Sequence, residues 1–152
     1  MTEARRSVLI VDDSPDGREM LAEYLTFRGF EVIDAVNGEE ALAQARTRRP
    51  AVVLMDLQMP GMGGWEATRQ LKADPTTRNI IVIAVTAHAL MPDETIARQA
   101  GCDGFISKPY DISAVADALR EVLQRGRSGL VALDGLKPLP RASGKPRTIT
   151  AV

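Results

Sequence analysis

The sequence predicts an α/β sandwich, in which a parallel β-sheet is covered by helices on both faces. Two observations carry this prediction. Short apolar runs alternate five times with segments of helical pattern, and three of these runs are almost continuous in Val, Ile and Leu. Strands of that composition are buried on both faces, as they are in a parallel sheet with helices above and below it.

Five strands are expected along the chain, at "SVLIVDD" (7–13), "FEVIDA" (30–35), "AVVLMD" (51–56), "NIIVIAVT" (79–86) and "DGFIS" (103–107). The second of these alternates apolar and charged residues, which is typical of a strand at the edge of a sheet. The last one is short and follows a glycine-rich stretch.

Capping signals predict where the first two helices begin and end. Ser14 is expected to be the N-cap of the first helix, with Pro15 at its first position and Gly29 at its end. Asn37 and Glu40 open the second helix in the same way, as an N-cap residue followed three positions later by an acid.

Three further helices follow from the same kind of signal. The third begins near Gly64 and ends before Pro75, because proline stops a helix. The fourth has Pro92 early and Gly101 just after it. The fifth is capped by Asp111, and its apolar residues recur at steps of three and four, as expected of an amphipathic helix.

Length and composition indicate a single domain with a tail. The chain has 152 residues, 45% of them hydrophobic, and a net charge of −1. A lone cysteine, Cys102, excludes an internal disulfide and indicates a small buried apolar residue in a reducing compartment. Among the longest apolar runs is the one at 80–85, far shorter than a membrane span, so we expect a cytoplasmic protein without membrane insertion.

The domain is expected to occupy residues 1–125, and residues 126–152 to form a flexible basic tail. The tail has no sustained helical or strand period and carries five Lys/Arg against one Asp, whereas the rest of the chain carries 14 Lys/Arg against 19 Asp/Glu. A solvated extension or a linker is a simpler interpretation of this charge than a nucleic-acid arm, so no direct DNA binding is expected.

Polar residues stand at the carboxyl ends of four predicted strands. Asp12 and Asp13 end the first strand, Asp56 the third, Thr86 the fourth and Lys108 the fifth. In an open parallel sheet, ligands bind beyond these ends, where the strand order reverses. We therefore expect these side chains to meet at one edge of the sheet.

The chemistry of that cluster points to phosphoryl transfer. Three neighbouring carboxylates repel one another unless a cation lies between them, and carboxylates with backbone oxygens and waters are ligands that Mg²⁺ takes. A carboxylate nucleophile beside a divalent metal, an ammonium group and a hydroxyl can accept and hold a phosphoryl group. Each residue alone has a simpler interpretation, as a cap, a turn residue or a surface lysine. Their joint position at the strand ends favours a site.

The chain from about residue 7 to residue 125 resembles the receiver domain of two-component response regulators, and most of all stand-alone receivers of the chemotaxis and cell-cycle types. The motifs that carry the resemblance are "LIVDD", "VVLMDLQMPGMGG", "AVTA" and "GCDGFISKP", together with the fivefold βα pattern. The resemblance implies a flavodoxin-like, doubly wound (βα)5 sheet in a three-layer sandwich, with strand order 2-1-3-4-5.

The resemblance also implies a role for each site residue. Asp56 would be the phospho-acceptor, and Lys108 and Thr86 would contact the phosphoryl group. Asp13, Asp56 and the backbone carbonyl of Gln58 would bind Mg²⁺ directly, and Asp12 would do so through water.

Other positions would act on the response. Thr86 and Phe105 would form the switch, with the ring of Phe105 turning inward on activation. Gln58 and His88 would tune how fast the acyl phosphate hydrolyses, and the Lys108–Pro109 bond would be cis, which an X-Pro bond tolerates for only about 0.5–1 kcal/mol.

The implied function is a phosphorylation switch without classical enzyme turnover, with at most self-phosphorylation from small donors and autodephosphorylation. Its phosphoryl donor would be a histidine kinase or a histidine phosphotransfer protein. A downstream target protein would bind the face of the fourth helix, fifth strand and fifth helix. A weak homodimer is compatible with the resemblance.

Three alternatives remain open at this point. An aspartate-nucleophile phosphatase of the haloacid dehalogenase type would need an acid two residues after the nucleophile, where this chain has Gln58. A flavin or dinucleotide binder would need a glycine-rich phosphate loop, and "DDSPDG" is acidic instead. A degenerate receiver that only binds proteins is disfavoured because every acceptor-site residue is present.

Overall fold

Five parallel strands form the sheet in the predicted order β2-β1-β3-β4-β5, and a sixth, β6, adds to the outer edge of β5. The computed structural model describes residues 7–57, 59, 61–86, 98–130 and 136–138. Its elements are β1 (Ser7–Val11), α1 (Pro15–Phe27), β2 (Glu31–Ala35), α2 (Gly38–Arg48), β3 (Val52–Asp56), α3 (Gly64–Ala73), β4 (Ile81–Thr86), β5 (Gly104–Ser107), α5 (Ile112–Arg125), the 3-10 helix η2 (Gly126–Leu130) and β6 (Leu136–Pro138).

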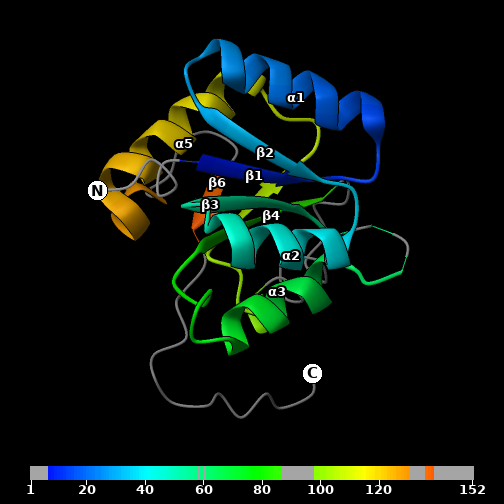
Figure 1. Ribbon diagram of the computed structural model, residues 1–152. Coiled ribbons are helices and arrows are strands. Elements are labelled where there is room, and N and C mark those ends of the chain that lie inside the picture. The colour runs from blue at the N-terminus through cyan, green and yellow to red at the C-terminus, as the bar shows by residue number, and fades with distance from the viewer. Residues whose placement is uncertain (1–6, 58, 60, 87–97, 131–135, 139–152) are drawn as a thin grey trace.

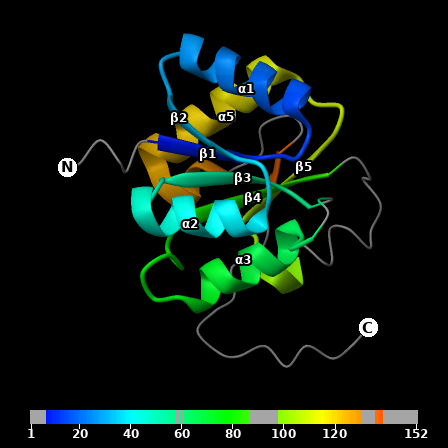
Figure 2. The same ribbon diagram turned by 45° about the vertical axis from the view of Figure 1, so that its right-hand side comes forward.

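Helices cover both faces of the sheet, which confirms the three-layer sandwich. Helices α1 and α5 lie on one face, and α2 and α3 lie on the other (Figure 1). The view in Figure 2, turned by 45°, shows the same layers. Most of the predicted fourth helix lies outside the described residues, and only residues 98–100 are seen as helical.

Each central strand contributes side chains to two separate cores, because successive residues of a strand point to opposite faces. Leu9, Val53 and Val82 belong to the core under α2 and α3. Val8 and Ile83 belong to the core under α1 and α5. This explains why the sequence of these strands is almost continuously apolar. The edge strand β2 instead alternates between exposed and buried residues, as predicted.

Helix starts follow the predicted capping residues. The side chain of Asn37 accepts a hydrogen bond from the backbone of Glu40, and Asp111 accepts from the backbone of Ser113 and Ala114. Ser14 occupies the N-cap position of α1 but makes no capping hydrogen bond with its side chain. Gly29 follows α1 with a φ of +94°, a conformation that glycine adopts at little cost.

The predicted tail differs from the structure in two places. Residues 126–130 form η2 directly after α5, and residues 136–138 form β6, which pairs antiparallel with β5. Residues 131–135 and 139–152 lie outside the described part. In the described part, no helix is long and apolar enough to cross a membrane.

Candidate functional site

The three predicted carboxylates come together at the carboxyl ends of β1 and β3. These strands are parallel neighbours with Val11 opposite Met55, so Asp12 follows on one strand where Asp56 ends the other. One oxygen of each of Asp12, Asp13 and Asp56 lies within 4.8 Å of the others. Asp56 is buried and Asp13 is exposed, so the cluster runs from the protein interior to the surface.

Local backbone contacts fix the two strand ends. A backbone N–H of Ser14 donates to Asp12 Oδ1 over 2.9 Å, and the guanidinium of Arg18 donates to the carbonyl of Asp12 over 2.9 Å. On β3, the start of α3 lies directly against the backbone of Asp56, so closely that a Cβ on Gly64 would collide with the Asp56 carbonyl. Glycine at 64 therefore lets the chain turn away from Asp56 without covering its side chain.

Lys108 reaches the acidic cluster from β5. Its Nζ lies 3.8 Å from Asp12 Oδ2 and 3.9 Å from Asp56 Oδ2. Lys108 therefore forms an ion pair with each of the two carboxylates, but both distances are too long for a hydrogen bond. The backbone N–H of Lys108 donates to the carbonyl of Thr86 over 2.7 Å, and the predicted cis bond joins Lys108 to Pro109.

Thr86 and Phe105 lie on the same face of two neighbouring strands. Phe105 is opposite Ala84 in the register of β4 and β5, and Thr86 lies two residues further along. Both side chains are buried, and the Phe105 ring is only 1% exposed. The structure therefore shows Phe105 in an inward position, and its movement on activation stays a prediction.

Gln58 and His88, the residues expected to tune hydrolysis, lie outside the described residues. Gln58 was also expected to bind the metal through its backbone carbonyl. Of the residues implied to bind metal or phosphate, the structure brings together Asp12, Asp13, Asp56 and Lys108.

The donor set fits a hard divalent cation. Three carboxylate oxygens are the type of ligand that Mg²⁺ takes, and oxygens around an octahedral Mg²⁺ lie roughly 3 to 4.2 Å apart. The three carboxylate oxygens lie within 4.8 Å of one another, which is close to the spacing of such a shell. When bound, the ion would offset negative charge on the oxygens gathered there.

An apolar hollow of about 630 Å³ adjoins the acidic cluster, and sequence analysis did not anticipate it. It is lined by Asp12, Gly17, Met20, Lys108, Pro109, Tyr110 and Ile112. The pKa of Tyr110 is raised, chiefly by burial and also by the negative charges of Asp12 and Asp56. Met20 is 61% exposed at its rim, and an exposed methionine on the amphipathic α1 is a signal that could have indicated the hollow.

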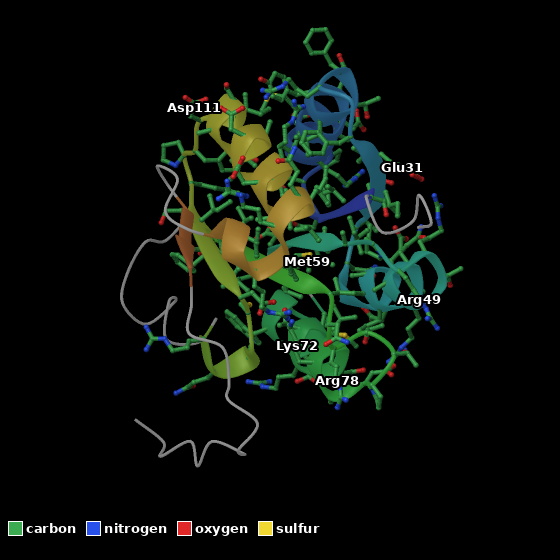
Figure 3. All side chains as sticks on the ribbon, turned by 90° about the vertical axis from the view of Figure 1, so that its left-hand side faces the viewer. Glu31, Arg49, Met59, Lys72, Arg78 and Asp111 are labelled. Atoms are coloured by element: carbon green, nitrogen blue, oxygen red, sulfur yellow. The ribbon has the colours of Figure 1, made fainter. Side chains whose placement is uncertain are left out.

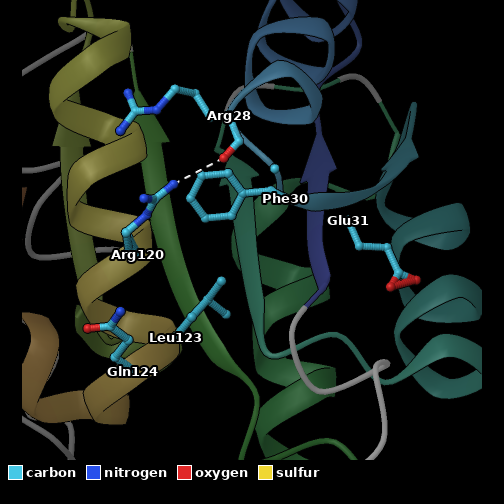
Figure 4. Close-up of a pocket in the computed structure, with 7 residues that line it drawn as sticks. Arg28, Phe30, Glu31, Arg120, Leu123 and Gln124 are labelled. Carbon is cyan, nitrogen blue, oxygen red and sulfur yellow. Dashed lines mark hydrogen bonds between the residues drawn. The ribbon is translucent and has the colours of Figure 1, made fainter.

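A second hollow, of about 400 Å³, lies at the opposite end of the strands, between α5 and the start of β2. There Arg120 donates to the carbonyl of Arg28 over 3.0 Å and stacks on the ring of Phe30 (Figure 4). Arg28 in turn donates to Asp117 over 2.7 Å. The side chains of Arg28 and Arg120 therefore connect the end of α1 to α5. The side chain of Glu31 points away from Phe30 in Figure 4.

The strand order and the strand-end cluster of carboxylates and lysine define a receiver-type α/β domain. Sequence comparison agrees, because the response regulator receiver domain family matches residues 8–120. The chain therefore belongs to the response regulator receiver family and is a two-component response regulator.

Relatives and solved structures are of the same kind. The polar-differentiation response regulator DivK of Brucella anthropi is 41% identical over 118 residues, which span 78% of this chain and 96% of that protein. The chemotaxis protein CheY4 of Vibrio cholerae has a TM-score of 0.73 at 29% identity, covering 78% of this chain and 98% of that one. A response regulator from Chloroflexus aurantiacus has a TM-score of 0.74 at 28% identity, covering 80% and 99%.

Proposed function

We propose that the chain accepts a phosphoryl group on Asp56, with Mg²⁺ bound by the acidic cluster, from the phosphohistidine of a kinase or phosphotransfer protein. The observation that carries this proposal is the meeting of three carboxylates and one ammonium group at the end of β3. Asp56 is the nucleophile because its side chain is less exposed than that of Asp12 or Asp13. A rigid central strand also holds it in place.

The reaction moves the phosphoryl group from nitrogen to oxygen. A carboxylate oxygen of Asp56 attacks phosphorus, the P–O bond forms, and the P–N bond to the donor histidine breaks. The imidazole leaves with the electron pair of that bond and takes a proton from solvent. Lys108 lies near enough to Asp56 to offset charge on the transferred oxygens. Asp12 and Asp13 would hold the Mg²⁺, which would supply further positive charge there. The same geometry supports self-phosphorylation from small phosphodonors.

The donor would approach over the hollow beside the site. The exposed side chain of Met20 and the apolar rim at Pro109 and Ile112 offer a contact surface next to Asp56, and the phosphohistidine itself would enter past Lys108. A response of Thr86 and Phe105 would then carry the change to the face of β5 and α5, where a target protein would bind. Gln58 and His88 would set the lifetime of the acyl phosphate.

The phosphatase alternative is not favoured, because the fold and the family match are those of a receiver. Membership of the receiver family places the chain among signalling proteins. A phosphatase of this type needs an acid two residues after the nucleophile, and this chain has Gln58 there.

The test is phosphorylation by acetyl phosphate with and without Mg²⁺, followed by intact-protein mass spectrometry. Wild type is expected to gain one phosphoryl group only with Mg²⁺, and Asp56→Asn to gain none. Asp111→Asn is the matched control, since asparagine caps a helix as well as aspartate does and position 111 lies outside the cluster. Equal labelling of wild type and Asp56→Asn would remove Asp56 from the role.

A further inference from the structure

The outer edge of β5 carries neither of the residue types that usually protect an edge strand, a charged residue or a proline. Its sequence, "GFIS", has no charge and no proline, and Phe105 and Ile106 favour strand pairing. The opposite edge of the sheet, β2, carries the exposed acids Glu31 and Asp34. An open edge offers unpaired backbone groups to any other strand, and proteins block it with charges, prolines, short strands or a cover. The β5 edge therefore depends on a cover.

Residues 126–130 and 136–138, which we together name the C-terminal arm, supply that cover. Within the arm, β6 pairs antiparallel with β5, with Leu136 opposite Ile106 and Pro138 opposite Gly104. Figure 3 shows β6, in orange, beside β5 at the limit of the sheet. The arm lies beyond residue 120, where the family match ends.

An ion-pair network holds the first part of the arm on the domain. Arg127 Nε lies 3.0 Å from Asp103 Oδ1, and the Asp103 side chain is 5% exposed. The other oxygen of Asp103 accepts from Lys72 Nζ over 2.8 Å and from the backbone N–H of Val82 over 2.9 Å. Since Asp103 directly precedes β5, the arm is fixed at the start of the strand that it covers.

Apolar packing holds the arm as well. Leu130 is 4% exposed and belongs to the core under α1 and α5. Gly129 lies so close to the end of α5 that a Cβ there would collide with the carbonyl of Glu121. The arm is thus packed on the domain by an ion pair, a buried leucine and a close backbone approach.

The strand that the arm adds is itself a poor template for further pairing. It has three residues, and two of them are Lys137 and Pro138. Short strands, lysine and proline are the features that block edge-to-edge association, and proline has no N–H to donate. Adding β6 therefore replaces an unprotected edge with a protected one.

We propose that the C-terminal arm closes the β5 edge against strand pairing with a second copy of this chain. A second copy is the fitting partner because it carries the same uncharged strand, and antiparallel pairing of β5 with β5 about a twofold axis would satisfy both edges at once. This role is independent of phosphorylation at Asp56.

The test uses the full chain with the double substitution Leu136→Pro and Lys137→Pro, which leaves β6 no backbone N–H to donate. Leu136→Ala with Lys137→Ala is the matched control, because it shortens the same side chains and keeps both N–H groups. At a dilution where the proline variant is monomeric, amide hydrogen exchange over Gly104–Ile106 is expected to rise roughly tenfold, the effect of losing about 1.4 kcal/mol of protection. At higher concentration, sedimentation velocity is expected to show a dimer for the proline variant and a monomer for wild type.

A second pair of variants tests the ion pair between Arg127 and Asp103, which fixes the arm on the domain. Arg127→Ala removes the arm's ion pair and leaves Asp103 bonded to Lys72 and Val82, so the domain should fold. Arg125→Ala is its control, since Arg125 forms an ion pair with Glu121 of its own helix and its side chain is 65% exposed. Faster exchange over Gly104–Ile106 is expected in Arg127→Ala alone.

Three results would overturn the proposal. Unchanged exchange in the proline variant would mean that the arm does not cover β5. Faster exchange without any dimer would mean that the uncovered edge does not pair with a second copy. A dimer of wild type as strong as that of the proline variant would mean that the arm does not prevent association.

Discussion

Two buried aspartates in this protein show how surroundings give one residue type two roles. Asp103 accepts from Lys72, Arg127 and the backbone of Val82, so its charge is balanced by hydrogen-bonded partners inside the fold. Lys108 Nζ lies 3.9 Å from Asp56 Oδ2, and the Asp56 carboxylate lies beside those of Asp12 and Asp13. Asp56 could be predicted from sequence because it ends an apolar strand. The partners of Asp103 are distant in sequence, so its ion-pair network could not be predicted from the sequence.

Cys102 gives a prediction at the same scale. Burial raises the pKa of its thiol from about 9 to about 12, as expected of an apolar site. The thiolate fraction at about pH 8 should then be roughly a thousandfold smaller than for an exposed thiol. We expect Cys102 to react with iodoacetamide only slowly in the folded protein and rapidly in urea, measured by mass spectrometry.

The sign of the pH effect on stability follows from the same pKa. A thiol whose pKa is higher in the folded state favours folding below pH 9, and this contribution is lost as the pH rises from about 9 to about 12. The free energy of unfolding of wild type should fall more steeply over this range than that of Cys102→Ala. Equal slopes would mean that the thiol does not keep its proton in the folded protein.

At the scale of elements, local signals predicted the strands and the helix starts, and the resemblance to receiver domains implied the strand order. An element that depends on a non-local contact was missed. Asn37 and Asp111 cap their helices because the capping bond involves residues only two or three positions away. The strand β6 has three residues and no alternating pattern, and it exists because β5 offers it an edge. A chain ending at Arg125, which the sequence suggested as a complete domain, would lack Arg127 and Leu130.

The contact between α3 and β3 gives a prediction about the site. Gly64→Ala places a Cβ against the carbonyl of Asp56, so the start of α3 or the end of β3 must move. We expect a loss of about 1–3 kcal/mol in the free energy of unfolding and slower phosphorylation by acetyl phosphate.

The neighbouring residue offers the control. A Cβ on Gly63 would meet its nearest atom, Trp65 Nε1, at 3.6 Å, which is an ordinary contact. Gly63→Ala should therefore keep both the urea midpoint and the phosphorylation rate near the wild-type values. If the two variants behave alike, the close approach at Gly64 does not position Asp56.

Across the whole molecule, the acidic site and the face of β5 are linked by a short path through neighbouring strands. Asp56 is opposite Val85 in the register of β3 and β4, Thr86 is the next residue, and its carbonyl accepts from the backbone of Lys108. Phe105 lies on the same face as Thr86, one strand further on. A change in charge at Asp56 can therefore reach β5 through Thr86 and Phe105.

The last prediction tests whether that path carries a signal. A phosphoryl group adds about −1.5 to −2 charges at Asp56, and its oxygens can accept a hydrogen bond from the buried hydroxyl of Thr86. Moving Thr86 would change the space beside the Phe105 ring, so the two positions of this pair would form the two states of the switch. A bias of about 1.4 kcal/mol shifts two such populations tenfold, which one charge-assisted hydrogen bond can supply.

Beryllofluoride, a mimic of the phosphoryl group, makes this measurable by NMR. Thr86→Ala is expected to keep the shift changes around Asp56, which report binding of the mimic, and to lose most of those around Phe105. Thr86→Ser retains the hydroxyl and should keep both sets, which separates the hydrogen bond from the loss of side-chain volume. If Thr86→Ala shows the wild-type changes at Phe105, the signal leaves the site by another route, because the hydroxyl is then not required for the outer strand to respond.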